Sequence, residues 1–383
     1  MRTLGVLVLL ASLALAARPA EDRLTVTVAA FEKDRRWVVV EYDAKGKTLP
    51  GSEVTDEKGT SQPGQATPRG LAWLVPFIPA GQKLRFTLGG PGGSLPAAGL
   101  RWDEVAPGVS ALKAGDREIT RYHVGVSAEK YKKPFFYPLM THGVNLLRGW
   151  PMDPQEGEPA DHPHHTGHYF AFGEVNGKEY WSKLPITPKK LQKEAGPVFS
   201  RIVAENDWGE DLVENQDVRL LSLGEDVILD WTITLTAAHG PVTFAKDLKQ
   251  AKEGAFVLRM AKELSFAKGD APEMILDSKG NRGEKLAREA GAPWVDYTGT
   301  IRGKSVGVAI MNHPSSFRYP SDWHVRAYGL FAANPWILKG ENTLQKGQSL
   351  TLRWRVYAHG GDAAQGKVAE VFAGYAASEV VAD

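Results

Sequence analysis

The feature that most constrains the fold is the run Val227–Thr236, in which apolar and polar residues alternate over most of its length. In an extended chain, Trp231, Ile233 and Leu235 fall on one face and three threonines fall on the other. A period of two is typical of a β-strand with one buried face. Because Leu350–Tyr357 repeats the pattern, we predict a fold built mainly from strands.

Shorter segments with strand character are separated by turn residues. They are Trp37–Tyr42, Leu84–Leu88, Tyr122–Val126, Phe199–Ala204 and Val306–Ile310. Helical spacing occurs near the C-terminus, at Val368, Val371, Phe372 and Tyr375, with Asp362 as the candidate N-cap. The sequence therefore predicts an all-β protein, a large β-sandwich with a short C-terminal helix.

Composition divides the chain into three parts. Arg2, the apolar run Leu4–Leu15 and the small residues up to Ala16 predict a signal peptide at 1–16, and hence export to the periplasm or beyond. That run is too short to span a bilayer, and no later stretch is long and apolar enough. The Gly/Pro-rich stretch Gly89–Gly99 predicts a boundary. We expect a small β-module at 17–115 and the main sandwich at 116–383.

Charge and composition exclude several function classes. The chain has 46 basic and 45 acidic residues, so it has no general electrostatic attraction for nucleic acid. It has no cysteine, which excludes thiolate chemistry and cysteine-ligated zinc. The Walker A loop and HExxH do not occur. The sequence does not identify a cofactor. With these chemistries excluded, the histidines are the main candidates for a functional site.

Four of the ten histidines lie within seven residues, in the stretch "DHPHHTGHYFAFGEVNG" (Asp161–Gly177). Imidazoles titrate near neutral pH and ligate metals, so this density suggests acid/base chemistry or a metal site. The proline is expected to hold His162 in an extended conformation. His162 and His164 should then point to one side and His165 to the other.

A second block, Asn312–Trp336, repeats the His-Pro pair at His313 and interleaves polar side chains with aromatic ones. Aromatic faces can cover the C–H surface of a sugar, while Arg, Asn and His bind its hydroxyl groups. Carboxylates occur at turns, and Glu253, which precedes a strand containing Arg259, is the one we select as an acid/base partner.

Several quoted blocks together resemble a known bacterial family. They include "FYPLMTHGVNLLRGWP", "DHPHHTGHYFAFGEVNGKEYW", "DSKGNRGE" and "VGVAIMNHPSSFRYPSDWHVRAYGLFAANPW", and the resemblance runs from Lys133 to Gly361. The family has been labelled "methane oxygenase PmoA" and also a domain of unknown function. This sequence departs from the family pattern at Thr166 and His168.

The resemblance implies a galactose-mutarotase-like or related β-sandwich, in which histidine and a carboxylate act on a sugar. It does not imply alkane oxidation, because the particulate methane oxygenase subunits are membrane proteins with several spans, and no spanning segment is found here.

We therefore hypothesise an exported carbohydrate-active enzyme of epimerase, lyase or hydrolase type, whose histidines line a single polar cleft. The candidate catalytic residues are His164, His165, Glu253, His313 and His324. The candidate substrate-binding residues are Arg148, Asp161, His162, Asn312, Trp323, Arg326 and Asn334. The expected partner is a carbohydrate or another small polar substrate.

Two alternatives remain open at this point. One is a non-catalytic sugar-binding or envelope scaffold protein, which would use the same aromatic side chains. The other is a metal site formed by Asp161 with His162, His164, His165 or His168 through nitrogen and oxygen ligands.

Overall fold

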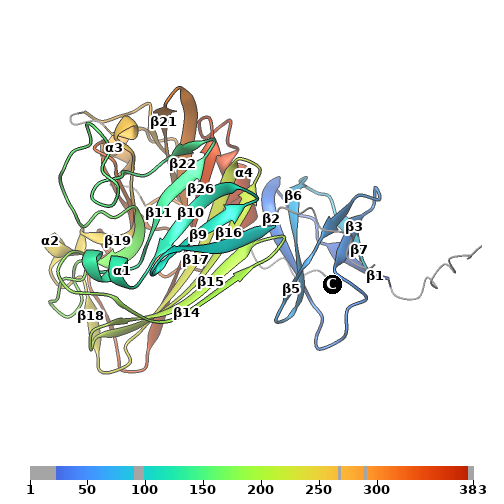
Figure 1. The fold of residues 1–383 in the computed structure, drawn as a ribbon, viewed down its shortest axis with the longest axis horizontal. Helices are drawn as coiled ribbons and strands as arrows, with labels where there is room; N and C mark the ends of the chain where they lie inside the picture. The colour runs from blue at the N-terminus through green and yellow to red at the C-terminus, as the bar shows by residue number, and fades with distance from the viewer. Residues whose placement is uncertain (1–22, 90–98, 266–268, 289–290, 378–383) are drawn as a thin grey trace, which may run out of the picture.

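The computed structural model describes residues 23–89, 99–265, 269–288 and 291–377. The predicted signal peptide and most of the Gly/Pro-rich stretch lie outside these ranges. The protein is a large β-sandwich with a smaller β-module beside it, as Figure 1 shows. No helix in the described ranges is long and apolar enough to cross a membrane.

One layer of the sandwich is an eight-stranded antiparallel sheet. Its strands, in spatial order, are β14 (Thr187–Ala195), β15 (Ser200–Trp208), β16 (Leu212–Leu223), β17 (Asp226–Thr236), β26 (Ser349–Gly360), β22 (Lys304–Asn312), β21 (Trp294–Ile301) and β20 (Ile275–Asp277). The two segments with the clearest alternation pair with each other, and Trp231 of β17 lies opposite Trp354 of β26.

The other layer is a nine-stranded antiparallel sheet. Its strands, in spatial order, are β23 (Asp322–Val325), β24 (Leu330–Asn334), β19 (Gly254–Arg259), β13 (His168–Phe172), β11 (Phe135–Thr141), β10 (Arg117–His123), β9 (Val109–Ala114) and β8 (Leu100–Ala106), and β12 (Val144–Asn145) pairs with β11.

Aromatic side chains fill the space between the two layers. Trp231 meets Phe136 of β11 edge to face, with ring centroids 5.3 Å apart, and Trp354 stacks on Phe256 of β19 at 4.7 Å. Because side chains alternate along a strand, the neighbours of Phe136 and Phe256 point away from the core. We call that side the outer face of the nine-stranded sheet.

Short elements complete the sandwich. They are the pair β18 (Val242–Phe244) and β25 (Asn342–Leu344), the helices α1 (Val126–Tyr131), α2 (Leu248–Ala251), α3 (Gly283–Ala287) and α4 (Val368–Ala376), and a 3₁₀ turn at Lys262–Leu264. The predicted strand Tyr122–Val126 is wrong in its second half, because β10 ends at His123 and α1 begins at Val126.

The predicted C-terminal helix is present as α4, but its N-cap is Lys367 rather than Asp362. Asp362 instead accepts hydrogen bonds from the backbone of Ala364 and Gln365, in the turn before the helix. The helix packs between the eight-stranded sheet and the module, so closely that a Cβ on Gly374 would lie 2.3 Å from a carbonyl oxygen of β2.

The module consists of two small sheets with a core of their own. One contains β1 (Leu24–Val28), β7 (Leu84–Leu88), β3 (Glu53–Asp56) and β4 (Ser61–Pro63), and the other contains β2 (Arg35–Asp43), β6 (Gly70–Ile78) and β5 (Gln65–Thr67). β8 and β9 pair into the nine-stranded sheet instead. The expected boundary at residue 115 therefore falls after two strands of the main sandwich.

A carboxylate is buried between the two layers. Glu214 of β16 has no exposed surface and accepts a hydrogen bond from Trp208 Nε1 at 2.5 Å and another from Gln216. Burial raises its pKa to about 7, although the hydrogen bonds oppose that shift. Below this pH the carboxyl is neutral in the folded protein, and above it the protein holds a desolvated charge.

This burial predicts a pH dependence of stability. An unfolded glutamate ionises near its ordinary pKa, so the folded state loses up to about 3 kcal/mol relative to the unfolded state as pH rises from 4.5 past 7. In Glu214→Gln, the fall in melting temperature between pH 5 and pH 8 should be smaller than in the wild type. Glu210→Gln, at an exposed position, is the control and should keep the wild-type fall. Equal falls in all three proteins would contradict the assignment.

Candidate functional site

The loop between β12 and β13 crosses the outer face of the nine-stranded sheet, and a charge network with two buried arginines holds it there. Arg148 is buried, and its guanidinium donates to the Asp161 carboxylate and to the carbonyl oxygens of Asp161 and His162, at 3.0 and 3.2 Å. Arg259, at the end of β19, also reaches Asp161, at 3.3 Å. Two guanidiniums from different segments therefore share one carboxylate.

The charge of Asp161 follows from this geometry. Burial by itself would raise its pKa, but hydrogen bonds from Arg148 and His162 and the charge of Arg259 outweigh burial, so the pKa of Asp161 lies below its ordinary value. Asp161 is therefore ionised at neutral pH and serves to fix the loop.

The expected extended conformation of His162 is wrong. Its φ is +43°, in the left-handed region that non-glycine residues seldom adopt. In this conformation both Asp161 and His162 turn their carbonyl oxygens toward Arg148. The hydrogen bonds to a buried guanidinium override the local preference that proline imposes on the preceding residue.

Three imidazoles then form one group, which we call the histidine cluster: His162, His164 and His165. The ring of His165 is stacked on His162 with centroids 4.9 Å apart and meets His164 at 4.5 Å. Trp181 closes one side, at 5.5 Å from His164 and 5.3 Å from His165. The expectation that His165 points away from the other two is therefore wrong.

Two rings of the cluster, those of His164 and His165, are held in their uncharged form. Burial, with a further contribution from the charge of Lys133, lowers the pKa of His164 to about 3. Burial and the neighbouring His164 lower the pKa of His165 well below its ordinary value. A neutral imidazole has one nitrogen that donates and one that accepts, so at neutral pH both rings can exchange hydrogen bonds with a ligand.

Cationic and aromatic side chains surround the cluster on the outer face. The Arg259 guanidinium lies 4.7 Å from the ring centroid of Tyr328, and the His162 ring lies 6.0 Å from the same ring. Lys133 is buried, with Nζ 4.4 Å from the Tyr169 ring, and burial lowers its pKa to about 7. Arg148 and Arg259 therefore bring more positive charge to the cluster than the one carboxylate that they share, Asp161.

Several buried polar atoms at this site have no hydrogen-bond partner among the described residues. They are Nε and Nη1 of Arg259, Nε of Arg148, Nδ1 of His165 and Oη of Tyr169. A buried polar atom left unpaired costs about 1–3 kcal/mol. Other unpaired buried atoms are spread over the described residues, but these five lie close together here, which fits a site that binds water or a ligand.

Glu253 is close enough to take part. It precedes β19, is half-buried, and has His162 and Arg326 among its electrostatic neighbours. Burial raises its pKa, although nearby cations oppose the shift. Arg326 lies at the edge of the same site, 5.6 Å from the Tyr328 ring, and pairs with Glu284 at 2.7 Å.

His324 lies on the same outer face, but one of its ring nitrogens is already hydrogen-bonded to the backbone. Its Nδ1 lies 2.8 Å from the carbonyl oxygen of Lys252, and burial lowers its pKa to about 4. Its electrostatic neighbours are Arg326, Arg288 and Lys252 rather than members of the histidine cluster. His324 therefore borders the site from the side of β23.

The structure corrects the expectation that His313 shares this pocket. His313 follows β22, which belongs to the eight-stranded sheet, and its ring meets Tyr375 of α4 at 5.0 Å. It lines a separate cavity of about 310 Å³ between that sheet and the module. The two His-Pro pairs, at His162 and His313, therefore lie on opposite sides of the sandwich.

Three predicted substrate-binding residues are structural instead. Trp323 points into the core and donates from Nε1 to the carbonyl oxygen of Ala292. The Asn312 amide bridges Arg353 O and Ser321 N, and the Asn334 amide bridges Ala251 O and Trp336 N. Each side chain is fully buried and satisfies backbone groups, so none of the three is available to a substrate.

His168 also belongs to the core. It contacts Trp231 and Phe256, its Nδ1 lies 2.9 Å from Val257 O, and burial lowers its pKa to about 4. Within the described residues, no three His, Asp or Glu side chains are arranged to hold a metal ion.

Reasoning from the sequence does not identify four residues of this site: Lys133, Tyr169, Trp181 and Tyr328. It includes Arg259 only as a residue of the strand that follows Glu253. The available indication was one basic residue at the end of the apolar strand "GAFVLR". An arginine there requires a carboxylate partner, but only the fold reveals that this partner is Asp161.

The uncharged state of His164 can be measured directly. Because the pKa of His164 is about 3, its ring should remain neutral at pH 5, where a free imidazole would be protonated. We expect the ring carbon shifts of His164, followed by NMR on histidine-labelled protein and assigned with His164→Gln, to stay constant from pH 7.5 to pH 5. A shift change centred near pH 6.5 would refute the burial argument.

Comparison with known proteins adds the following. A family model described as "Family of unknown function (DUF6807)" matches residues 110–373. No curated protein matches the chain. Two solved structures are weakly similar: heparan sulfate lyase HepC from Pedobacter heparinus, as a mutant, has a TM-score of 0.38 and 9% identity over 71% of this chain and 38% of its own. A polysaccharide lyase has a TM-score of 0.30 and 12% identity over 72% of this chain and 34% of its own.

This chain spans well under half the length of either lyase, and at such TM-scores neither likeness bears on what it does. The family match covers more than half of the chain and includes the loop that carries the histidine cluster. The family description carries no methane oxygenase label. The chain therefore belongs to the DUF6807 family, a family of unknown function.

Proposed function

We propose that this protein is a carbohydrate-active enzyme that moves protons on a sugar at the histidine cluster, by chemistry of the lyase or epimerase type. The observation that carries the proposal is the grouping on one face of the sheet of three imidazoles, two of them held neutral by burial, with buried guanidiniums that keep unpaired nitrogen atoms. The predicted signal peptide makes it an exported enzyme.

The protonation states suit acid/base catalysis. His164 is half-buried and neutral at pH 7, so it can accept a proton, while burial places the pKa of Lys133 at about 7 and raises that of Glu253. Catalytic acids and bases work best when their pKa values lie near the working pH and differ from one another. Lys133 and Glu253 fit this requirement better than His164, whose low pKa makes it a weak base in the resting protein.

The arginines fit the negative charge that proton removal creates. When a proton leaves a carbon next to a carboxylate or carbonyl group, charge builds on the oxygen, and fixed donors in a water-poor site stabilise it. Arg259 offers Nε and Nη1, both unpaired, and Arg148 offers Nε. A uronate or an oxidised sugar has the required carbon.

Hydrolysis is less well supported. Glycoside hydrolases commonly use two carboxyl groups about 5–9.5 Å apart, one as acid and one as base or nucleophile. At the histidine cluster Asp161 is tied to two arginines, which leaves Glu253 as its available carboxyl group. The lack of a second available carboxyl group at the cluster favours elimination or epimerisation over hydrolysis.

A non-catalytic sugar-binding protein is the second candidate. The observation in its favour is the rigidity of the Arg148–Asp161–Arg259 network, which would also suit recognition of an acidic sugar without turnover. The two candidates differ in whether any sugar is converted.

The test begins with a screen of the purified protein against uronate-containing oligosaccharides and oxidised sugars. On the substrate found, Glu253→Gln should lower turnover by about 10²–10⁴-fold, the usual contribution of one acid/base group. His164→Ala should also lower turnover, because it removes a neutral ring that can hydrogen-bond the sugar. Its melting temperature should change little, because the ring is half-buried and accounts for none of the network's ion pairs.

His313→Ala is the matched control, since it removes an imidazole on the opposite side of the sandwich. It should keep wild-type turnover. Equal losses in His164→Ala and His313→Ala would contradict the placement of the reaction at the histidine cluster. Tight binding of an acidic oligosaccharide with no conversion of it would favour the binding protein.

A further inference from the structure

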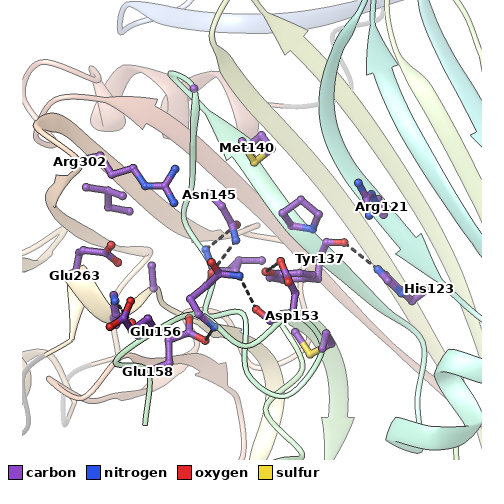
Figure 2. A pocket seen from close by; sticks show the side chains of 18 residues that line it. Arg121, His123, Tyr137, Met140, Asn145, Asp153, Glu156, Glu158, Glu263 and Arg302 are labelled. Carbon is purple, nitrogen blue, oxygen red and sulfur yellow. Dashed lines mark hydrogen bonds between the residues drawn. The ribbon is translucent and has the colours of Figure 1, made fainter. Parts of the chain in front are cut away.

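A cavity of about 550 Å³ opens on the same outer face, on the other side of the loop that carries the cluster. Tyr137 of β11, which alternates with the core residue Phe136, lies in its floor, and the loop forms one wall through Met152, Asp153 and Glu156 (Figure 2). This volume is within the range of small-molecule sites, about 300–1,000 Å³.

The wall of the cavity is preorganised. The Glu158 carboxylate accepts hydrogen bonds from the backbone of Gly149, Trp150 and Gln155, at 2.7–3.0 Å. Asn145 accepts from Leu139 and Leu147 in the same way, at 3.1 and 3.0 Å. Because these polar side chains hydrogen-bond the backbone around the cavity, the cavity keeps its form without a ligand.

Other polar groups at the cavity are free to bind. Arg302 and Glu263 reach it from the same side, as Figure 2 shows, and among the described residues neither side chain has a hydrogen-bond or ion-pair partner. Glu156 adds a carboxylate, and Lys262 an ammonium that donates to the Glu156 carbonyl oxygen. Aliphatic side chains, among them Leu147 and Ile301, complete the lining.

The chemistry of this lining disfavours an anionic ligand. Four carboxylates (Asp153, Glu156, Glu158 and Glu263) face three cations (Arg121, Lys262 and Arg302), and Arg121 is also paired with Glu118. The cations therefore do not outweigh the carboxylates, and an anion would meet net repulsion. A ring with many hydroxyl groups can donate to the carboxylates, accept from the cations and place its C–H surface on the aliphatic side chains.

The cavity and the histidine cluster are joined by consecutive residues. Leu147 lines the cavity and pairs with Met260, whereas the next residue, Arg148, fixes the cluster through Asp161 and donates from its backbone to Arg259 O at 2.9 Å. A chain of sugars could therefore occupy both places by passing over the loop.

We infer that this cavity is a subsite for an uncharged sugar residue, so that the substrate is an oligosaccharide or polysaccharide extending from the histidine cluster. The inference rests on the proposed function for its reaction, but the binding step can be tested separately.

The test uses the full chain and three neutral hexasaccharides, of glucose, xylose and mannose, with binding measured by calorimetry and ligand-observed NMR. The double variant Arg302→Ala/Glu263→Ala removes both free groups at exposed positions. It should weaken binding of the preferred hexasaccharide at least tenfold. Met140→Trp, which fills the cavity without changing charge, should do the same.

The matched control is Lys304→Ala/Glu273→Ala, which removes the same two charges from exposed positions outside the cavity and should bind like the wild type. Unchanged affinity in both cavity variants, or no binding of any hexasaccharide by the wild type, would overturn the subsite. Loss of turnover in His164→Ala would in that case leave the proposed function standing.

Discussion

The sharing of Asp161 by Arg148 and Arg259 is the interaction on which the candidate site depends. It ties a loop of more than twenty residues to the end of β19, and both guanidiniums are buried. Two buried cations without the carboxylate would be strongly destabilising, because the desolvation of each would be uncompensated. The network therefore sets the position of the histidine cluster and also supplies part of the positive field that keeps the rings of His164 and His165 neutral.

The two faces of the nine-stranded sheet have different roles: the inner face forms the core and the outer face carries the candidate site. The inner face is apolar and aromatic, and it packs through Phe136 and Phe256 on the tryptophans of the opposite sheet. The outer face carries Tyr169 and Arg259, buried beneath a loop rather than beneath another sheet. Unpaired polar atoms there are tolerated because the inner face supplies the stability, a division expected where function requires incompletely satisfied groups.

Local pattern predicted much of the fold. The alternation at Val227–Thr236 and the i, i+3, i+4, i+7 spacing at Val368–Tyr375 correspond to β17 and α4, because each element buries one face. The pattern could not show which sheet a strand joins, and this is why His313 was placed with His164. Side chains alternate with a period of two in both layers, so this period does not distinguish them. β22 belongs to the eight-stranded sheet because it pairs with β21 and β26.

The candidate site could likewise be predicted only in part, because sequence patterns do not show which distant segments meet. The histidines, Asp161 and Arg148 are close in sequence, so their proximity could be expected from the chain alone. Lys133, Tyr169, Arg259 and Tyr328 come from four separate segments, and only the sheet brings them together. The left-handed conformation of His162 depends on Arg148, which is fourteen positions away.

The most direct test of this account is a crystal structure of His164→Ala soaked with a uronate-containing oligosaccharide. The account predicts ordered sugar on the outer face of the nine-stranded sheet, beside Tyr328 and His162, with an acidic group within hydrogen-bond distance of Arg259 or Arg148. Sugar bound instead at the cavity beside His313, between the eight-stranded sheet and the module, with the histidine cluster empty, would contradict it.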